Sequence, residues 1–284
     1  MKKITFKCKY GKIKGLVWGK GNSKKMLALH GWLDNAASFC ALAPKIADLG
    51  YEVVAIDFPG HGKSAHRAKG HFTHFIDFVL DVQNIIEELK WKKTTLLGHS
   101  MGAAMAHMYA ISYPERVDKL IMIENLGPVP AYQPGTMAEN LKEALVQWNK
   151  HTIKHKHFYA SIDEALKMRL KVTPMSAQLL KPMVERGLKL TKKGYHWRTD
   201  KRLRLRSMVR FSEEQVQDAL SAKKPSTLLI LATPQTYALD YPTSKNRRDK
   251  LQAESYVVLK GHHHLHMDNA EEVYQSIKTF IDKK

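Results

Sequence analysis

Cysteine and long apolar runs are scarce in this sequence. The two cysteines, Cys8 and Cys40, in 284 residues exclude a disulfide framework and a zinc or iron–sulfur site built from four thiolates. We therefore expect a cytoplasmic protein. Residues 1–10 are basic, but no apolar run follows them, so a signal peptide is not predicted. Glycine and polar residues interrupt the longest uncharged stretch, residues 94–114, and we expect no stable membrane insertion.

Acidic residues are also scarce, 27 against 46 lysines and arginines, which gives a net charge of +19. Residues 127–222 contain 18 of the basic residues and 9 of the acidic ones. This charge is compatible with nucleic acid, an anionic membrane or an acidic substrate as partner. We expect no nucleic acid, because the sequence contains no recognised binding module. Basic residues are densest in residues 198–210. We favour the interpretation that this segment is a solvated, salt-bridged surface, and contact with an anionic substrate or a membrane surface is the alternative.

Short apolar or alternating runs predict strands, and stretches of helical period lie between the later ones. The predicted strands are residues 4–8, 13–18, 25–30, 51–57, 94–99, 119–124, 226–232 and 255–261. The predicted helices of the same region are residues 38–49, 72–89, 101–112 and 269–281. This alternation indicates an α/β fold with a mostly parallel central sheet and flanking helices, and leaves room for antiparallel pairing among the earliest strands.

Residues 127–222 break the alternation. They contain amphipathic stretches and no strong strand; the stretches are residues 139–149, 162–170, 176–188 and 212–220. We expect an inserted helical cap, or lid, called the insert below. Residues 1–126 and 223–284 then form the core.

The sharpest motif is Gly98-His99-Ser100-Met101-Gly102, a G-x-S-x-G between a predicted strand and a predicted helix. A serine on such a tight turn projects its hydroxyl out of the sheet, and the two glycines remove Cβ atoms that would clash. The alternative is an ordinary glycine-rich turn with a capping serine. The strand–turn–helix setting favours Ser100 as a nucleophile.

Two other segments supply partners for this serine. His30-Gly31-Trp32 follows a predicted strand, where the Trp32 N–H can face a developing oxyanion together with the N–H of Met101. We expect these two groups to form the oxyanion hole, and His30, Gly31 and His99 to contact substrate. The run His262-His263-His264, with His266, follows the last predicted strand and offers a general base. No compact set of cysteines or carboxylates accompanies it, so we expect no metal.

Four motifs in order make the sequence resemble the α/β-hydrolase superfamily over essentially the whole chain. They are HGW at 30–32, DFPGHGKS at 57–64, GHSMG at 98–102 and HHHLHMD at 262–268. HGWLDNAASF, IENLGP and YHWRTDKRLRLRS followed by SEEQV are more narrowly similar to the serine-hydrolase-like group. Dehalogenases and epoxide hydrolases of this superfamily use an aspartate nucleophile, and Ser100 argues against both. Asp57 lacks the setting of a nucleophile, and we expect it to hold its loop by local hydrogen bonds.

The resemblance implies the α/β-hydrolase fold and a Ser–His–acid triad that cleaves an ester-type bond through an acyl-enzyme, without a cofactor. Family-like spacing selects His263 as the base. Members of the family often carry an aspartate shortly after the penultimate strand, but here Asp240 comes five residues too late. Glu124 ends a predicted strand, and its segment resembles that of haloalkane dehalogenases. We therefore expect Glu124 as the acid, with Asp240 as the alternative.

Several activities share these residues. A carboxylesterase acting on a small or medium acyl substrate is the expectation we favour, with no partner beyond that small molecule and a monomer or homodimer as the oligomeric state. Lactonase, thioesterase, cofactor-free haloperoxidase and carbon–carbon bond hydrolase stay open. A non-catalytic ligand-binding protein of the same fold is a further alternative, because a fold does not determine a function.

Overall fold

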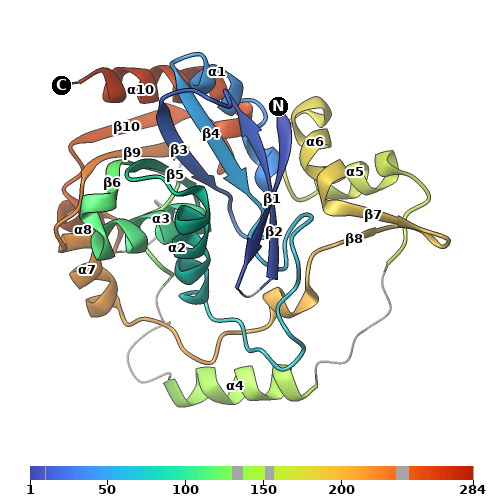
Figure 1. The fold of residues 1–284 in the computed structure, drawn as a ribbon. Helices are drawn as coiled ribbons and strands as arrows, with labels where there is room; N and C mark the ends of the chain where they lie inside the picture. The colour runs from blue at the N-terminus through green and yellow to red at the C-terminus, as the bar shows by residue number, and fades with distance from the viewer. Residues whose placement is uncertain (10, 130–136, 151–156, 235–242, 284) are drawn as a thin grey trace.

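The protein is built around an eight-stranded sheet (Figure 1). The computed structural model describes residues 1–283 except 10, 130–136, 151–156 and 235–242. The strands lie in the order β1-β2-β4-β3-β5-β6-β9-β10. Their bounds are β1 Lys2–Cys8, β2 Gly11–Trp18, β3 Lys24–Leu29, β4 Tyr51–Ile56, β5 Thr94–His99, β6 Val117–Ile123, β9 Ser226–Thr233 and β10 Ser255–Lys260.

The sheet is mostly parallel, as predicted. β1 pairs antiparallel with β2, and β2 antiparallel with β4, whereas every other neighbouring pair is parallel. The central strands β3, β5 and β6 are almost wholly buried, which is typical of parallel strands covered on both faces. Because their carboxyl ends meet at one edge of the sheet, the loops that follow them come together there.

Helices cover both faces of the sheet. The chain continues through η1 Ala36–Phe39, α1 Ala43–Ala47, α2 Asp77–Leu89, α3 Met101–Ser112, η2 Pro114–Arg116, α8 Ser244–Leu251, α9 Leu265–Asp268 and α10 Ala270–Asp282. The apolar side chains of α1 and α10 join one buried cluster, and those of α2 and α3 join a second cluster on the other face. In the described part of the chain, no helix is long and apolar enough to cross a bilayer.

Two predicted helices differ in extent from the observed ones. The helix predicted from residue 72 begins at Asp77, whose carboxylate accepts the N–H of His74 at 2.8 Å and holds the preceding residues in a turn. Those residues, 73–76, contribute to a cavity described below. The helix predicted over residues 38–49 is divided in two, because Pro44 stands in the first turn of α1, a position proline favours.

The insert contains a short hairpin besides its helices, which the sequence analysis, expecting no strong strand there, did not predict. Its elements are α4 Met137–Asn149, α5 Ile162–Leu170, α6 Ala177–Gly187, β7 Leu188–Thr191, β8 Gly194–Trp197, η3 Lys201–Arg204 and α7 Glu213–Ser221. β7 and β8 form a hairpin, to which Tyr159 adds a bridge through Tyr195. Gly194, at a φ of +106°, permits the tight approach, because a Cβ there would lie 2.6 Å from the Tyr159 carbonyl oxygen.

Candidate functional site

Ser100 lies on the sharp turn between β5 and α3. Its backbone has φ 50° and ψ −119°, a conformation that costs a non-glycine residue roughly 1–3 kcal/mol and that the surrounding packing enforces. A Cβ on Gly98 would lie 2.3 Å from the Ala103 Cα, and one on Gly102 would lie 2.0 Å from the Leu29 carbonyl oxygen. Both glycines are therefore required by close backbone approach, and the turn presents the Ser100 side chain at the carboxyl edge of the sheet.

Glu124 directly follows β6, beside this turn. Its side chain is 1% exposed and its φ is +56°, so the backbone turns away from the sheet at this residue. The N–H of Ala232, on β9, donates to Oε1 at 2.5 Å, and the N–H of Glu124 donates to the Ile230 carbonyl at 2.9 Å. The neighbouring strand thus fixes the carboxylate, which leaves Oε2 for a partner on the other side.

That partner is His263, on the loop between β10 and α9. Its Nδ1 lies 3.0 Å from Glu124 Oε2, and its Nε2 lies 3.0 Å from Ser100 Oγ. Hydroxyl, imidazole and carboxylate therefore form one hydrogen-bonded line, although 163 residues separate Ser100 from His263. This is the arrangement in which a neutral imidazole accepts the serine proton while the carboxylate holds its other nitrogen.

The two residues predicted to supply the oxyanion hole, Trp32 and Met101, both line the cavity that contains Ser100. Met101 is the first residue of α3, so its N–H has no carbonyl partner within the helix. Trp32 lies on the loop after β3. The indole Nε1 of Trp32 donates to the Leu203 carbonyl at 3.3 Å, which ties this loop to the insert.

The three predicted substrate contacts have different positions. Gly31 lines the cavity, as does His99, which is nonetheless 1% exposed. The Nε2 of His99 donates to the His263 carbonyl at 2.7 Å, so His99 supports the loop of the candidate base. Burial, with the neighbouring histidines, lowers the pKa of His99 well below its ordinary value and keeps the ring neutral.

His30 is a correction to the sequence analysis, because it does not line the cavity. It is fully buried, accepts the Phe58 N–H at Nε2 at 3.0 Å and donates from Nδ1 to the Gly31 carbonyl at 2.7 Å. Both ring nitrogens are thus occupied by backbone groups of two loops. His30 connects the loop after β3 to the loop after β4 and has no position from which to contact substrate.

Asp34 is the residue that the sequence analysis missed. It is 3% exposed, accepts from Arg169 Nη2 at 3.1 Å and lies 3.2 Å from His264 Nε2. Burial alone would raise the pKa of Asp34, but attraction and a hydrogen bond from His264, with attraction from Arg169, hold it far below its usual range. Burial alone would lower the pKa of His264, but Asp34 raises it. A charged pair therefore lies beside the line formed by Ser100, His263 and Glu124.

The other histidines of the run have separate partners. Nδ1 of His262 lies 3.0 Å from Asp268 Oδ2 near the surface. His266 is fully buried with its ring centroid 4.1 Å from that of His99, and burial lowers its pKa to about 3. Within the described residues, no group of three or more histidine, cysteine or acidic side chains is arranged to hold a metal ion.

Asp57 is confirmed as a structural residue. Its carboxylate accepts the N–H of Ala36 at 2.8 Å and the N–H of Lys63 at 2.7 Å, which organises the loops after β3 and β4. The sequence did not indicate its third partner, Arg186 of the insert, whose Nε lies 2.8 Å from Oδ1. Arg186 and Asp57 are both buried, so this ion pair joins insert and core out of contact with water.

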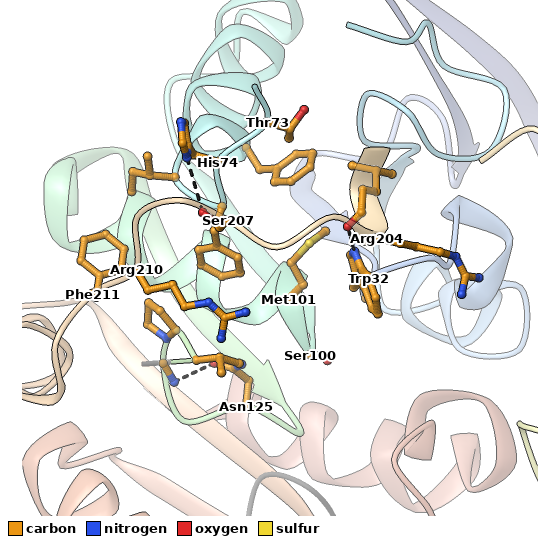
Figure 2. A pocket seen from close by; sticks show the side chains of 18 of the residues that line it. Trp32, Thr73, His74, Ser100, Met101, Asn125, Arg204, Ser207, Arg210 and Phe211 are labelled. Atoms are coloured by element: carbon orange, nitrogen blue, oxygen red, sulfur yellow. Dashed lines mark hydrogen bonds between the residues drawn. The ribbon is translucent and has the colours of Figure 1, made fainter. Parts of the chain in front are cut away.

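A cavity of about 1080 Å³ contains Ser100 (Figure 2). It is lined by the loop after β3 and by residues 73–76, 124–129, 203–207 and 209–211. In Figure 2, Trp32 and Arg210 approach from opposite sides, with Met101 and Ser100 between them. Core and insert therefore both contribute to its wall. Asp240, the alternative acid, lies outside the described residues.

Comparison with known proteins shows the relatives of this chain. A family model described as alpha/beta hydrolase fold matches residues 25–270. The chain is similar to a serine hydrolase-like protein of Danio rerio, at 31% identity over 96% of this chain and 86% of the fish protein. It is also similar to a probable serine hydrolase of Drosophila melanogaster, at 33% identity over 96% and 85%. Among solved structures, a hypothetical protein of Pseudomonas aeruginosa PAO1 matches with a TM-score of 0.92 and 33% identity over 100% of both chains.

Proposed function

The chain belongs to the α/β-hydrolase family and resembles its serine hydrolase-like members, and from this premise we propose that it hydrolyses an ester-type bond of a small or medium acyl substrate. The observation that carries the proposal is the pair of 3.0 Å contacts of His263, one to Ser100 and one to Glu124. A carboxylic ester is the substrate bond that we favour, and the reaction passes through an acyl-enzyme.

In the proposed reaction, His263 Nε2 takes the hydroxyl proton as Ser100 Oγ attacks the carbonyl carbon. Glu124, fixed by the Ala232 N–H, stabilises the imidazolium that forms. The tetrahedral oxyanion accepts hydrogen bonds from the N–H groups of Trp32 and Met101. When the intermediate collapses, His263 returns the proton to the leaving alcohol. A water molecule, deprotonated by the same imidazole, then attacks the acyl-enzyme and releases the acid.

We further propose that the insert acts as a cap over this reaction. Three contacts between insert and core support the proposal: Arg186 with Asp57, Arg169 with Asp34, and Asn35 Nδ2 with the Met183 carbonyl at 2.9 Å. Residues 203–211 of the insert complete the cavity wall. A substrate enclosed there would be shielded from bulk water, which strengthens the electrostatic interactions of the site.

Fluorophosphonate labelling tests the proposed nucleophile directly, because the probe reacts with an activated serine whatever the natural substrate is. Wild type, Ser100→Ala and the control Ser221→Ala, which alters an exposed serine on α7, are labelled and the adduct is located by mass spectrometry. We expect labelling confined to Ser100 and unchanged in the control. On a panel of esters of graded acyl length, Ser100→Ala should lose about 10³-fold or more in rate. A folded wild type without label, or undiminished turnover by Ser100→Ala, would overturn the proposal.

A further inference from the structure

The loop after β3 makes a tight turn over residues 31–34. The N–H of Asp34 donates to the Gly31 carbonyl at 3.2 Å, and Leu33 between them has a φ of +65°. This left-handed conformation is costly for a residue other than glycine, so it persists only where surrounding contacts enforce it. The turn also carries Trp32, whose N–H is one of the two proposed oxyanion donors. Contacts that hold the turn therefore hold that donor.

A buried carboxylate holds this turn. The side chain of Asp34 is 1% exposed; its Oδ1 accepts from Arg169 Nη2 at 3.1 Å, and its Oδ2 lies 3.2 Å from His264 Nε2. The Trp32 indole supplies another contact, to the Leu203 carbonyl, but this bond is longer, at 3.3 Å, and exposed. Hydrogen bonds to an ionised group are roughly twice as strong as bonds between neutral groups. The carboxylate therefore restrains the turn more firmly than the indole does.

The same carboxylate joins the turn to two other parts of the protein. His264 directly follows His263 in the chain, on the loop of the proposed base. Arg169 belongs to α5 of the insert, so its guanidinium reaches the core from the proposed cap. His99, at the end of β5, approaches Oδ2 only to 3.8 Å, which is beyond a hydrogen bond. Asp34 thus connects the turn with the base loop on one side and with the insert on the other.

We propose that Asp34 is a positioning residue for the proposed reaction and that its carboxylate holds the turn that presents the Trp32 N–H to the developing oxyanion. The inference rests on the proposed hydrolase function and gives the insert a part in it, because Arg169 completes the restraint. Asp34 does not contact the reacting atoms, since both of its carboxylate oxygens are already bonded within the protein. It acts through the turn.

Small displacements of an oxyanion donor have large effects on rate. The donor has to lie within hydrogen-bond distance of the position that the oxyanion will occupy, and removing one donor lowers kcat about 10²–10³-fold. A displacement of about 1 Å can lower a rate about 10²-fold. A turn released at Asp34 keeps the Trp32 N–H but no longer fixes its direction. We therefore expect a loss of about 10- to 100-fold in kcat, with KM changed by less than about threefold, because the contact forms in the transition state.

A slower reaction alone would not identify this role, because many structural defects lower a rate. Two esters that differ in one atom identify it: 4-nitrophenyl butyrate and its thiono analogue, in which sulfur replaces the carbonyl oxygen. Sulfur accepts hydrogen bonds weakly, so the thiono ester takes less stabilisation from the oxyanion donors, whereas proton transfer by His263 is the same for both. The ratio of the two kcat/KM values, called the ester ratio below, therefore reports the state of the oxyanion hole.

In Asp34→Asn, the ester ratio should fall roughly tenfold, because hydrolysis of the oxygen ester loses more than hydrolysis of the thiono ester. Glu124→Gln, which weakens the base, should slow both esters alike and leave the ratio unchanged. Asp81→Asn is the matched control: Asp81 lies on α2, is 2% exposed and pairs with Arg67, so the same buried carboxylate is lost away from the site. It should leave both rates unchanged. An equal loss for both esters in Asp34→Asn, or no loss, would overturn the inference.

Arg169→Met and Arg169→Lys test the restraint from the side of the insert, and they provide the test if Asp34→Asn does not fold. Methionine has no hydrogen-bond donor, whereas lysine keeps a cation that can bond to Asp34. We expect the ester ratio to fall in Arg169→Met and to recover in part in Arg169→Lys. A wild-type ratio in folded Arg169→Met would overturn the part assigned to the insert.

Hydrogen exchange separates this inference from the proposed function, because it requires no turnover. In Asp34→Asn, a peptide covering residues 31–36 should exchange about tenfold faster relative to peptides of the central strands, and in Asp81→Asn it should exchange as in the wild type. Faster exchange in a protein that fluorophosphonate does not label would support the restraint on the turn and reject the hydrolase proposal. Labelling of Ser100 with unchanged exchange and an unchanged ester ratio would leave the hydrolase proposal standing and reject the inference.

Discussion

Asp34→Asn is expected to destabilise the protein, because it leaves two cations beside a neutral amide in a buried site. Removing one partner of a buried ion pair costs about 3–5 kcal/mol. The side chains of Arg169 and His264 are 18% and 16% exposed, so each has access to water and the lower end applies, about 3 kcal/mol. For a chain of this size, Tm falls by about 2–4 °C per kcal/mol, which gives a loss of roughly 6–12 °C.

The loss of stability caused by Asp34→Asn should depend on pH. The pKa of His264 is raised above 6.5 in the folded state, so its contribution is complete below pH 6.5 and disappears as pH rises through the folded-state pKa. The pKa of Asp34 is lowered from 3.8, so its contribution is present above pH 3.8 and disappears as pH falls. The pair therefore stabilises most between these values. The difference between wild type and Asp34→Asn should be larger near pH 6 than near pH 9.

Urea denaturation followed by tryptophan fluorescence measures this difference at both pH values. His264→Gln and the double variant complete a thermodynamic cycle, whose coupling energy we expect near about 1–3 kcal/mol at the lower pH. Asp249→Asn, on the exposed surface of α8, is the matched control and should change the free energy of unfolding by less than about 0.5 kcal/mol. A loss for Asp34→Asn below about 1 kcal/mol, or one of equal size at both pH values, would refute this reasoning.

Three further outcomes are expected. Glu124→Gln should lower the steady-state rate of ester hydrolysis about 10³–10⁴-fold, because the amide no longer stabilises an imidazolium, whereas Asp240→Asn should lower it only a few-fold. The reverse ranking would assign the acid role to Asp240. Gly102→Ala should prevent stable folding, since its Cβ would lie 2.0 Å from a β3 carbonyl oxygen, whereas Gly70→Ala, with open space around it, should fold normally as judged by circular dichroism. Arg186→Met should lower the free energy of unfolding, measured by urea denaturation, by about 3–5 kcal/mol, because it leaves the buried Asp57 carboxylate without its cation. A loss under about 1 kcal/mol would mean that the backbone donors alone stabilise Asp57.

Features that depend on local spacing were predictable from the sequence. The serine turn is specified by two glycines at fixed offsets, and the central strands are uninterrupted apolar runs, so the mostly parallel sheet and the position of Ser100 followed directly. For Glu124 the sequence indicated only that a carboxylate at the end of an apolar strand requires a partner, and its choice over Asp240 as the acid came from the family resemblance. The structure then placed His263 within reach of both Ser100 and Glu124.

Features that depend on distant partners were not predictable. Asp34 and His264 are 230 residues apart, and neither has a motif that distinguishes it from a solvated loop residue. Only the position of Asp34 within HGWLDN, beside the predicted oxyanion loop, could have raised it as a candidate. Each strand of the β7–β8 hairpin has four residues. An alternation of apolar and polar residues over so short a stretch does not distinguish a strand from a loop.

The described contacts between the insert and the core are unevenly distributed. α5 and α6 are clamped to the core by two ion pairs with buried carboxylates and by the bond from Asn35. Among the described residues, α4 buries only Ala144; it contacts the rest of the protein through residues 206 and 207 and through Phe72, whose ring packs against Trp148, and it lies at the foot of Figure 1. Displacing α5 and α6 would uncover two buried carboxylates, whereas displacing α4 would break mainly hydrogen bonds already near water. Among the described contacts, the insert is therefore held to the core mainly through α5 and α6, and a change in the position of α4 would uncover less buried charge.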